Sequence, residues 1–409
     1  MNKLKLVMIG NGMAGVRTLE ELLKLTPDLY DITVFGAEPH PNYNRILLSP
    51  VLAGEQTMDE IVLNPFDWYR DNGITLHAGW KVTEVDRVKR VVTAENATGE
   101  RRTAPYDRLL LATGSNPFML PIPGRELDGV LAYRDMADTQ AMIDAAQKYK
   151  HAVVIGGGLL GLEAANGLMK RGMSVTVVHV AEWLMERQLD RVAGGMLQRS
   201  LQERGMQFRL GAQTQELLGD ASGRVNAVLF KDGTHVPAEL VVMAVGIRPE
   251  AGLAREAGLD VQRGIVVDDA MRTADPAIYA IGECAEHQGI CCGLVAPAFA
   301  QAETCARVIA GANIAYVAEA EATALKVAGA GVWSAGRIDA ADAEEIVLSD
   351  AEAGEYRKLL LREDRLVGAV LYGETLDAPW YQALIASGRP VQDLRAALAF
   401  GPAFIPVGN

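Results

Sequence analysis

The chain contains two glycine-rich stretches with the same spacing, Gly10-Asn11-Gly12-Met13-Ala14-Gly15 and Gly156-Gly157-Gly158-Leu159-Leu160-Gly161. Each stretch follows a short apolar run, Leu6–Ile9 or Ala152–Ile155, which is typical of a buried parallel strand. A helical pattern of apolar residues comes directly after each stretch. A strand, a glycine turn and a helix in this order form one unit of a parallel α/β sheet, and the chain contains that unit twice.

A turn of this kind is built to hold a pyrophosphate. Its first glycine permits the tight turn, its second lets the pyrophosphate approach the backbone, and its third lets the helix pack against the strand. The N-terminus of the following helix faces the negative charge. Since both copies have the required strand and helix on either side, the sequence predicts two dinucleotide sites rather than two accidental turns.

The first third of the chain alternates strand and helix patterns. Strands are predicted at 4–9 and 31–35, with a helix at 14–25 between them. A long connection leads to a strand-like segment at 82–93, which we interpret as an antiparallel piece inserted into βαβ wiring. Leu109–Gly114 has the pattern of a further buried strand, and the prolines and glycines that follow it predict a linker.

The second glycine turn opens a new unit over 151–245, with Leu162–Lys170 as its helix and Leu240–Val245 as its last strand. A later strand, Ile278–Ile281, resembles the end of the first unit's sheet more than the second's. We therefore predict an α/β fold with two Rossmann-like nucleotide-binding domains, the second inserted into the first. The first nucleotide-binding domain is predicted to consist of residues 1–117 and 246–318, and the second of residues 118–245. A small α+β C-terminal domain is predicted at 319–409, with a hairpin formed by 356–361 and 366–371.

Composition limits the classes of function. The 409 residues carry a formal charge of −13, which argues against a nucleic-acid partner because such binding needs clustered Lys and Arg. An acidic surface suits the basic face of a redox partner, although most acidic proteins are merely soluble. The longest apolar runs, such as Leu240–Val245, are far too short to cross a bilayer, so we expect a cytoplasmic protein without membrane contact.

All four cysteines lie in one late segment: Cys284, Cys291, Cys292 and Cys305. None forms a CxxC pair, and an iron–sulfur or metal site would need ligands at short, regular spacing. We therefore expect no metal site and ordinary reduced thiols, with the adjacent pair at 291–292 as the unusual feature.

An acidic residue is expected where the second strand of each unit ends, because it binds the hydroxyls of the adenosine ribose. In the first unit the strand leads to Glu38, and a plain surface glutamate is the alternative. In the second unit it leads to His179 instead. A carboxylate there would repel a 2′-phosphate, so His179, with Arg187 close in sequence, weakens discrimination against NADPH. The alternative is that His179 ends the strand and another group selects the nicotinamide.

Further motifs run along the chain: Tyr43-Asn44-Arg45-Ile46-Leu47-Leu48-Ser49, Ala112-Thr113-Gly114-Ser115, Leu162-Glu163-Ala164-Ala165, Leu184-Met185-Glu186-Arg187-Gln188-Leu189-Asp190, Gly246-Ile247-Arg248-Pro249 and Tyr279-Ala280-Ile281-Gly282-Glu283-Cys284-Ala285. With the two glycine turns, this set resembles the FAD- and NAD(P)H-binding N-terminal half of the assimilatory NAD(P)H nitrite reductase large subunit. The resemblance covers essentially the whole chain. Rubredoxin, ferredoxin and putidaredoxin reductases and NADH oxidases are similar more loosely.

The resemblance implies FAD on the first domain and NADH or NADPH on the second. The implied FAD residues are Gly10, Gly12, Met13, Ala14, Gly15, Glu38, Arg45, Val82, Ala112, Thr113, Gly114, Gly282 and Glu283. The implied NAD(P)H residues are Gly156, Gly158, Leu160, Gly161, His179, Arg187 and Gly246. Glu163 is the one candidate catalytic residue, expected near the nicotinamide. The alternative is a helix-start glutamate that interacts with the helix dipole.

The resemblance also implies a reaction: hydride passes from NAD(P)H to FAD, and electrons then pass to an iron–sulfur, haem or molybdenum redox partner in nitrate or nitrite assimilation. No cysteine precedes Cys284, which argues against a thiol relay. The complete subunit of this family continues into iron–sulfur and siroheme modules that are not found before Asn409, so we expect a separate electron acceptor.

Two alternatives stay open. One is a ferredoxin or rubredoxin reductase of an oxygenase system, or an NADH oxidase; the other is a redox-sensing flavin-binding protein. Relatives often dimerise through the C-terminal domain, so a homodimer is a further possibility. Trp333, Trp380 and Tyr381 could form such an interface, although core packing is the favoured interpretation.

Overall fold

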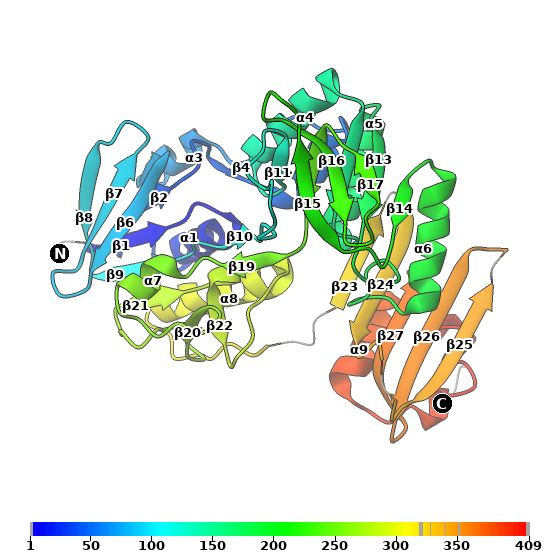
Figure 1. Cartoon of the computed structure of the whole chain (residues 1–409). Helices are drawn as coiled ribbons and strands as arrows, with labels where there is room; N and C mark the ends of the chain where they lie inside the picture. Colours follow the sequence, from blue (N-terminus) through cyan, green and yellow to red (C-terminus); the bar gives the residue numbers. More distant parts are fainter. Residues whose placement is uncertain (1–2, 319–321, 328, 340, 351, 406–409) are drawn as a thin grey trace. The chain divides into compact units, whose positions relative to one another are not determined.

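A computed structural model of the chain describes residues 3–318, 322–327, 329–339, 341–350 and 352–405 (Figure 1). The chain forms two compact units. Unit 1 comprises residues 1–48, 56–116 and 247–318, and unit 2 comprises residues 49–55, 117–246 and 319–409. The first glycine turn lies in unit 1 and the second in unit 2.

Unit 1 is built on a five-stranded parallel sheet in the order β21-β9-β1-β2-β5. Its strands are β1 (Leu4–Ile9), β2 (Tyr30–Gly36), β5 (Ile74–Ala78), β9 (Arg108–Leu111) and β21 (Ile278–Ala280). The last four residues of β1 are all buried, as expected for a strand that is covered on both faces of a parallel sheet. Because β21 pairs with β9, the prediction that this late strand completes the first sheet is confirmed.

Helices cover the sheet of unit 1. Figure 1 shows α1 (Met13–Leu25) beside α8 (Val295–Ile309), two segments that are far apart in sequence but pack together. The shorter helices of this unit are α3 (Phe66–Asp71) and α7 (Gly252–Glu256), and α2 (Leu48–Leu52) begins at the unit's edge. Its short paired strands are β3 (Asn42–Tyr43) with β4 (Val62–Asn64), β20 (Ile265–Val267) with β22 (Ala285–His287), and β10 (Ser115–Pro117) with β19 (Ile247–Pro249).

The segment predicted as one strand over 82–93 is instead part of a three-stranded antiparallel sheet, β6 (Trp80–Asp86), β7 (Val91–Asn96) and β8 (Arg101–Pro105). The chain turns after β6 because the Asp86 carboxylate accepts hydrogen bonds from the backbone N–H groups of Val88 and Lys89, at 3.1 and 2.9 Å. Arg90 completes the turn with a φ of +54°. The antiparallel character was predicted, but the break within the segment was not.

Unit 2 contains a second five-stranded parallel sheet, in the order β11-β18-β12-β13-β14. Its strands are β11 (Val130–Ala132), β12 (His151–Ile155), β13 (Ser174–Val178), β14 (Gln207–Arg209) and β18 (Leu240–Met243). The helices of this part are α4 (Met136–Lys148), α5 (Leu159–Lys170) and α6 (Arg191–Glu203). A three-stranded antiparallel sheet accompanies them: β15 (Thr214–Gly219), β16 (Val225–Phe230) and β17 (His235–Pro237). The predicted α/β class with two parallel sheets is confirmed.

The C-terminal part of unit 2 is an antiparallel sheet in the order β23-β24-β27-β26-β25, with the helix α9 (Ala378–Ser387). The predicted hairpin is confirmed, since β26 (Glu355–Arg362) pairs with β27 (Arg365–Tyr372). Glu363 and Asp364 between them both have positive φ, the geometry of the turn that suits the twist of two strands. The remaining strands are β23 (Ala322–Val327), β24 (Ala330–Gly336) and β25 (Glu344–Asp350).

The aromatic residues considered for an interface belong to the core of this C-terminal part. Trp333 and Tyr381 are 2% and 0% exposed, and Trp380 packs against the same cluster. The structure thus confirms the core interpretation for Trp333 and Tyr381, and Trp380 is half-buried beside them.

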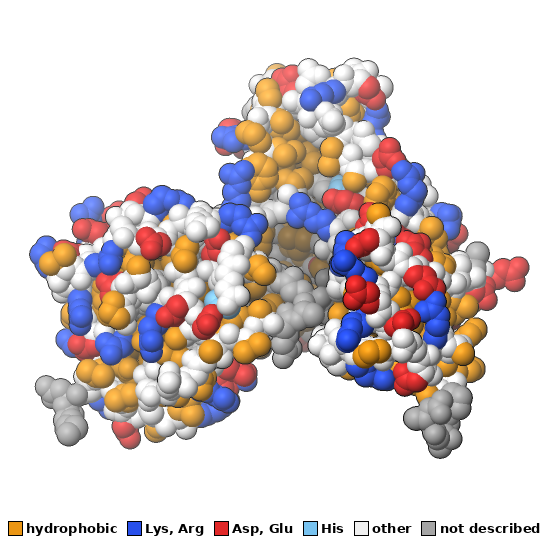
Figure 2. All heavy atoms as spheres, turned by 90° about the horizontal axis from the view of Figure 1, so that it is seen from below, with side chains coloured by type: hydrophobic (Ala, Val, Ile, Leu, Met, Phe, Trp, Pro, Cys, Tyr) orange, Lys and Arg blue, Asp and Glu red, His pale blue; other side chains and the backbone are white. Residues whose placement is uncertain are grey.

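Figure 2 shows acidic and basic side chains interspersed over the face in view. Among the described residues, no helix has both the length and the apolar character that crossing a bilayer requires.

Candidate dinucleotide-binding sites

The first glycine turn has one glycine that is open to a ligand and two that the fold itself requires. A Cβ on Gly10, which has a φ of +106°, would lie 2.1 Å from the carbonyl oxygen of Ala112. A Cβ on Gly15 would meet Met8 and Ala112 at 3.0 and 3.1 Å. A Cβ on Gly12 would meet no atom within 4 Å. The protein itself therefore leaves the space beside Gly12 open.

The start of α1 supports the same conclusion. Gly12 is its N-cap, no side chain caps the first N–H groups, and its first turn holds no acidic residue. Free N–H donors at a helix N-terminus bind anions such as a pyrophosphate. The residues of the first turn thus fit the phosphates of a dinucleotide.

The second turn repeats these features in unit 2. A Cβ on Gly156, at a φ of +126°, would lie 2.2 Å from the carbonyl oxygen of Ala244, and one on Gly161 would lie 2.0 Å from that of Gly156. A Cβ on Gly158 would again meet nothing within 4 Å. Gly158 is the N-cap of α5, without a side-chain cap or an acidic residue in the first turn. Both turns therefore have the same form, one on each parallel sheet.

Glu38 stands where the ribose-binding carboxylate was predicted. It follows β2, whose last residue, Gly36, lies so close to Asn11 of the turn that a Cβ there would be 2.9 Å from the Asn11 Cβ. The Tyr43 hydroxyl donates to one oxygen of Glu38 at 2.7 Å, and Arg45 donates to the other at 2.6 Å. These two bonds fix the orientation of a carboxylate that keeps 31% of its side chain exposed.

The late glycine–glutamate pair lies over the start of α1. A Cβ on Gly282, at a φ of +74°, would be 3.2 Å from the Cβ of Ala14. The Ser115 hydroxyl donates to Glu283 at 2.7 Å, and the buried Gln301 side chain accepts from the Gly282 N–H at 2.8 Å. The structure therefore brings together residues from three distant parts of the sequence, and Gln301 carries no sequence signal that could have revealed it.

The other residues of the predicted FAD set occupy separate positions in unit 1. The Thr113 hydroxyl donates to the backbone oxygen of Glu250 at 2.6 Å, and the Glu250 N–H donates to the Gly114 oxygen at 2.9 Å. Met13 lies at the start of α1, whereas Val82 is 7% exposed on β6, in the core.

His179 lies under the second glycine turn. Its Nδ1 accepts a hydrogen bond from the Gly157 N–H at 3.1 Å, and its Nε2 lies 2.8 Å from Oε2 of Glu186. The imidazole is 8% exposed. Arg187, the next residue of that segment, is exposed, and Leu160 is 36% exposed at the start of α5. Gly246 has a φ of +112°, and its oxygen accepts from the Phe118 N–H at 2.9 Å.

Glu163 is a half-buried acid in unit 2. The Ser49 hydroxyl donates to its Oε2 at 2.6 Å, and the Tyr133 hydroxyl donates to the Ser49 oxygen at 3.2 Å. Burial raises the pKa of Glu163 above its ordinary value, and the Ser49 hydrogen bond opposes that rise. Sequence reasoning identified Glu163 but not Ser49 or Tyr133, which come from separate elements.

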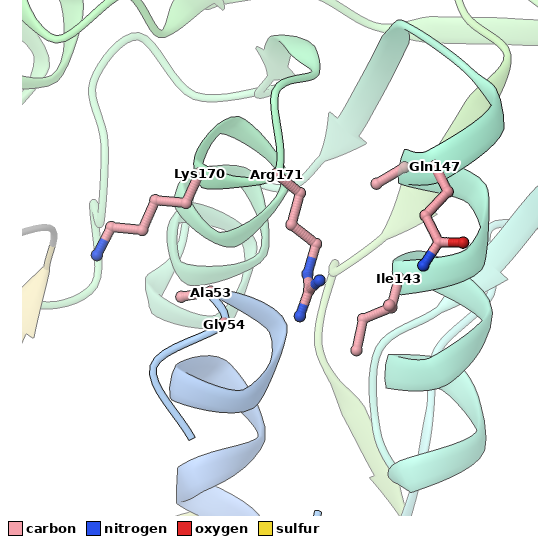
Figure 3. A pocket seen from close by; sticks show the side chains of 7 residues that line it. Ala53, Gly54, Ile143, Gln147, Lys170 and Arg171 are labelled. Atoms are coloured by element: carbon pink, nitrogen blue, oxygen red, sulfur yellow. The ribbon is translucent and has the colours of Figure 1, made fainter. Parts of the chain in front are cut away.

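A cavity of about 270 Å³ lies elsewhere in unit 2 (Figure 3). It is at the C-terminal end of α5, about 18 Å of helix from the glycine turn. Arg171 uses its guanidinium to bind the backbone oxygens of Leu52 and Val51, at 2.5 and 2.9 Å. The residues that line the cavity are Ala53, Gly54, Ile143, Ala146, Gln147, Lys170 and Arg171. We assign no ligand to this cavity.

The four cysteines are free thiols. Burial raises the pKa of the Cys284 and Cys305 thiols above the ordinary value. In the described part of the chain, no three His, Cys, Asp or Glu side chains gather closely enough to hold a metal ion.

Two anion-binding turns on two parallel sheets define a protein that binds two dinucleotides. The pattern of the pyridine nucleotide-disulphide oxidoreductase family matches residues 4–318, and the chain belongs to this family. The C-terminal domain of rubredoxin NAD+ reductase matches residues 322–389. The chain is thus an FAD-dependent NAD(P)H oxidoreductase, as predicted.

Curated relatives support the predicted resemblance. A nitrite reductase [NAD(P)H] of Bacillus subtilis is 51% identical over 377 residues, which cover 92% of this chain and 46% of the relative. An assimilatory nitrate reductase electron transfer subunit of the same organism is 46% identical over 379 residues, covering 92% of this chain and 48% of the relative. The chain therefore spans about half the length of these relatives.

Among solved structures, the covalent putidaredoxin reductase–putidaredoxin complex is similar to this chain with a TM-score of 0.85. Its sequence is 27% identical, and the match covers 95% of this chain and 94% of that one. The similarity over nearly both chains includes the C-terminal part as well as the two parallel sheets.

Proposed function

We propose that this chain takes a hydride from NAD(P)H onto FAD and passes the electrons to a separate redox protein of nitrate or nitrite assimilation. FAD supplies the step from two-electron to one-electron chemistry, and the chain supplies binding and orientation. The observation that carries the proposal is the pair of glycine turns, each with an open position at its second glycine. The similarity to a nitrite reductase and to a nitrate reductase electron transfer subunit supports the proposed pathway.

We assign FAD to unit 1. The first N–H groups of α1 would bind its pyrophosphate, and Glu38 would accept hydrogen bonds from the ribose hydroxyls. Tyr43 and Arg45 hold that carboxylate in place. Gly282 and Glu283 would face the flavin side of the same molecule, oriented by Ser115 and Gln301.

We assign NADH or NADPH to unit 2, at the start of α5. Glu163, four residues into that helix, is our candidate for the residue near the nicotinamide. The pKa of this half-buried carboxyl is raised above that of a free glutamate, because partial burial disfavours its charged form.

The test is anaerobic mixing of the purified yellow protein with NADH or NADPH while the visible flavin absorbance is recorded. We expect rapid bleaching, followed by reduction of a one-electron acceptor protein. A colourless polypeptide that takes up no added FAD would overturn the proposal. Very slow bleaching by both nicotinamides would favour the redox-sensing alternative.

The match to the rubredoxin NAD+ reductase C-terminal domain supports a second candidate, transfer to a rubredoxin or ferredoxin. The two candidates differ in the acceptor alone. Turnover should be compared with a rubredoxin, with a nitrite reductase component and with dioxygen, at equal concentrations of the reduced nicotinamide. Oxygen consumption that equals nicotinamide oxidation would instead identify an oxidase.

A further inference from the structure

We infer that Glu186 is the carboxylate that selects NADH over NADPH in this chain, and that His179 positions it. The inference rests on the proposed function, since it concerns the nicotinamide site of unit 2. The sequence indicated that the selecting carboxylate had been lost, because a histidine stands at the end of β13. The structure places a carboxylate against that histidine, from seven residues further along the chain.

The hydrogen bonds of His179 determine which nitrogen carries the proton. Nδ1 accepts from the Gly157 N–H at 3.1 Å, so the ring proton is on Nε2. Nε2 therefore donates to Oε2 of Glu186, at 2.8 Å. A buried imidazole thus connects the backbone of the glycine turn to the Glu186 carboxylate.

The segment that bears Glu186 is fixed against the same turn. The Met185 N–H donates to the Gly157 oxygen at 3.0 Å, and Met185 has a φ of +54°. Leu184, Met185 and Leu189 are each 0% exposed. The segment therefore binds the Gly157 oxygen directly, through Met185, and contacts the Gly157 N–H indirectly, through His179. These two hydrogen-bonded connections hold Glu186 at a defined distance from the dinucleotide turn.

Glu186 retains the capacity to bind a ligand. One of its oxygens accepts from His179, and among the described residues no donor lies within hydrogen-bond distance of the other, Oε1. The side chain is 33% exposed. The end of the second strand is where the adenosine ribose lies in this type of site. Oε1 can accept from a ribose hydroxyl, and its charge repels a 2′-phosphate.

Two arginines could oppose this selection. Arg209, which pairs with Val178 across β14 and β13, is already bound to Asp232 at 2.7 Å. Arg187 is exposed and makes no ion pair with any described residue. Because it follows Glu186 directly, a 2′-phosphate that reached Arg187 would also approach the Glu186 carboxylate. We therefore expect Glu186 to decide the preference and Arg187 to contribute little.

The first test compares Glu186→Gln with the wild type, using the KM and kcat for NADH and NADPH with ferricyanide as acceptor. We expect the wild type to prefer NADH. The variant should raise the KM for NADH about tenfold, with kcat nearly unchanged, and should lower the preference for NADH by at least that factor. Glu182→Gln is the matched control, because Glu182 is an exposed carboxylate of the same segment that pairs with Arg191.

The second test measures binding without any redox step. Titration calorimetry of the flavin-loaded wild-type protein should show tighter binding of ADP-ribose than of 2′-phospho-ADP-ribose. Arg187→Ala should preserve that order. The double variant His179→Asp/Glu186→Gln should recover the preference for ADP-ribose, since the aspartate returns a carboxylate to the strand end. A merely structural histidine would give no such recovery.

Three results would overturn the inference: tighter binding of 2′-phospho-ADP-ribose by the wild type, equal effects of Glu186→Gln on both nicotinamides, or an inverted preference in Arg187→Ala. Each can occur while flavin reduction proceeds normally. Failure of the proposed function is different, because neither NADH nor NADPH would then reduce the flavin. The wild-type titration remains decisive even if a variant does not fold.

Discussion

The Ser49 hydroxyl lies 2.6 Å from Oε2 of Glu163, although 114 residues separate the two in sequence. Ser49 in turn accepts from Tyr133, so the acid is linked to two neutral hydroxyls. Among the described residues, no lysine, arginine or histidine pairs with Glu163. Burial disfavours the charged form of this carboxyl and raises its pKa, and the hydrogen bond from Ser49 opposes that rise.

The raised pKa of Glu163 predicts a specific pH dependence of stability. Between the ordinary glutamate pKa and the raised value, the folded protein holds one proton more than the unfolded chain, so stability falls as pH rises through this window. Glu163→Gln should remove that fall. Melting temperatures of the wild type and the variant, measured from pH 4 to 8, should therefore diverge in favour of the variant as pH rises. Parallel curves would contradict the assignment.

Gly157→Ala should disturb the nicotinamide site while leaving the flavin bound. An added Cβ would lie 2.7 Å from Cγ of His179, so the imidazole must move and its contact with Glu186 must loosen. We expect a loss of about 1–3 kcal/mol in stability and a higher KM for NADH. Gly195→Ala is the control, because a Cβ there meets nothing within 4 Å. Unchanged NADH kinetics in Gly157→Ala would show that the His179 position is unimportant.

The glycine turns were predictable from the sequence because their requirements are local. Gly10 must lack a side chain to pass the Ala112 oxygen, and the neighbouring strand is a continuous apolar run. The partners of the site residues were not predictable in this way. Ser49 reaches Glu163 only through the tertiary fold, and Glu186 returns to His179 through a positive φ at Met185, a residue type that rarely adopts it.

The C-terminal sheet should depend on its buried leucines. Leu359 on β26 is 0% exposed, and Leu359→Ala should cost about 2–5 kcal/mol of unfolding free energy through lost burial and a cavity. Val347 on the neighbouring β25 is 49% exposed, so Val347→Ala is expected to cost under about 1 kcal/mol. Urea unfolding of the flavin-loaded proteins gives both values. Equal costs would mean that this sheet does not pack as described.

Valine at the second glycine of each turn should separate the two sites. Gly12 and Gly158 have extended backbones, with φ of −83° and −82°, and a Cβ at either place meets no atom within 4 Å. The fold can therefore accept valine, and the side chain would occupy only the space we assign to a pyrophosphate. Gly12→Val should give a folded, colourless protein, whereas Gly158→Val should remain yellow but should not be bleached by NADH or NADPH. Circular dichroism verifies folding, and the visible spectrum gives the flavin content of each variant. Stoichiometric flavin in Gly12→Val, or rapid bleaching of Gly158→Val, would show that the corresponding site is misassigned.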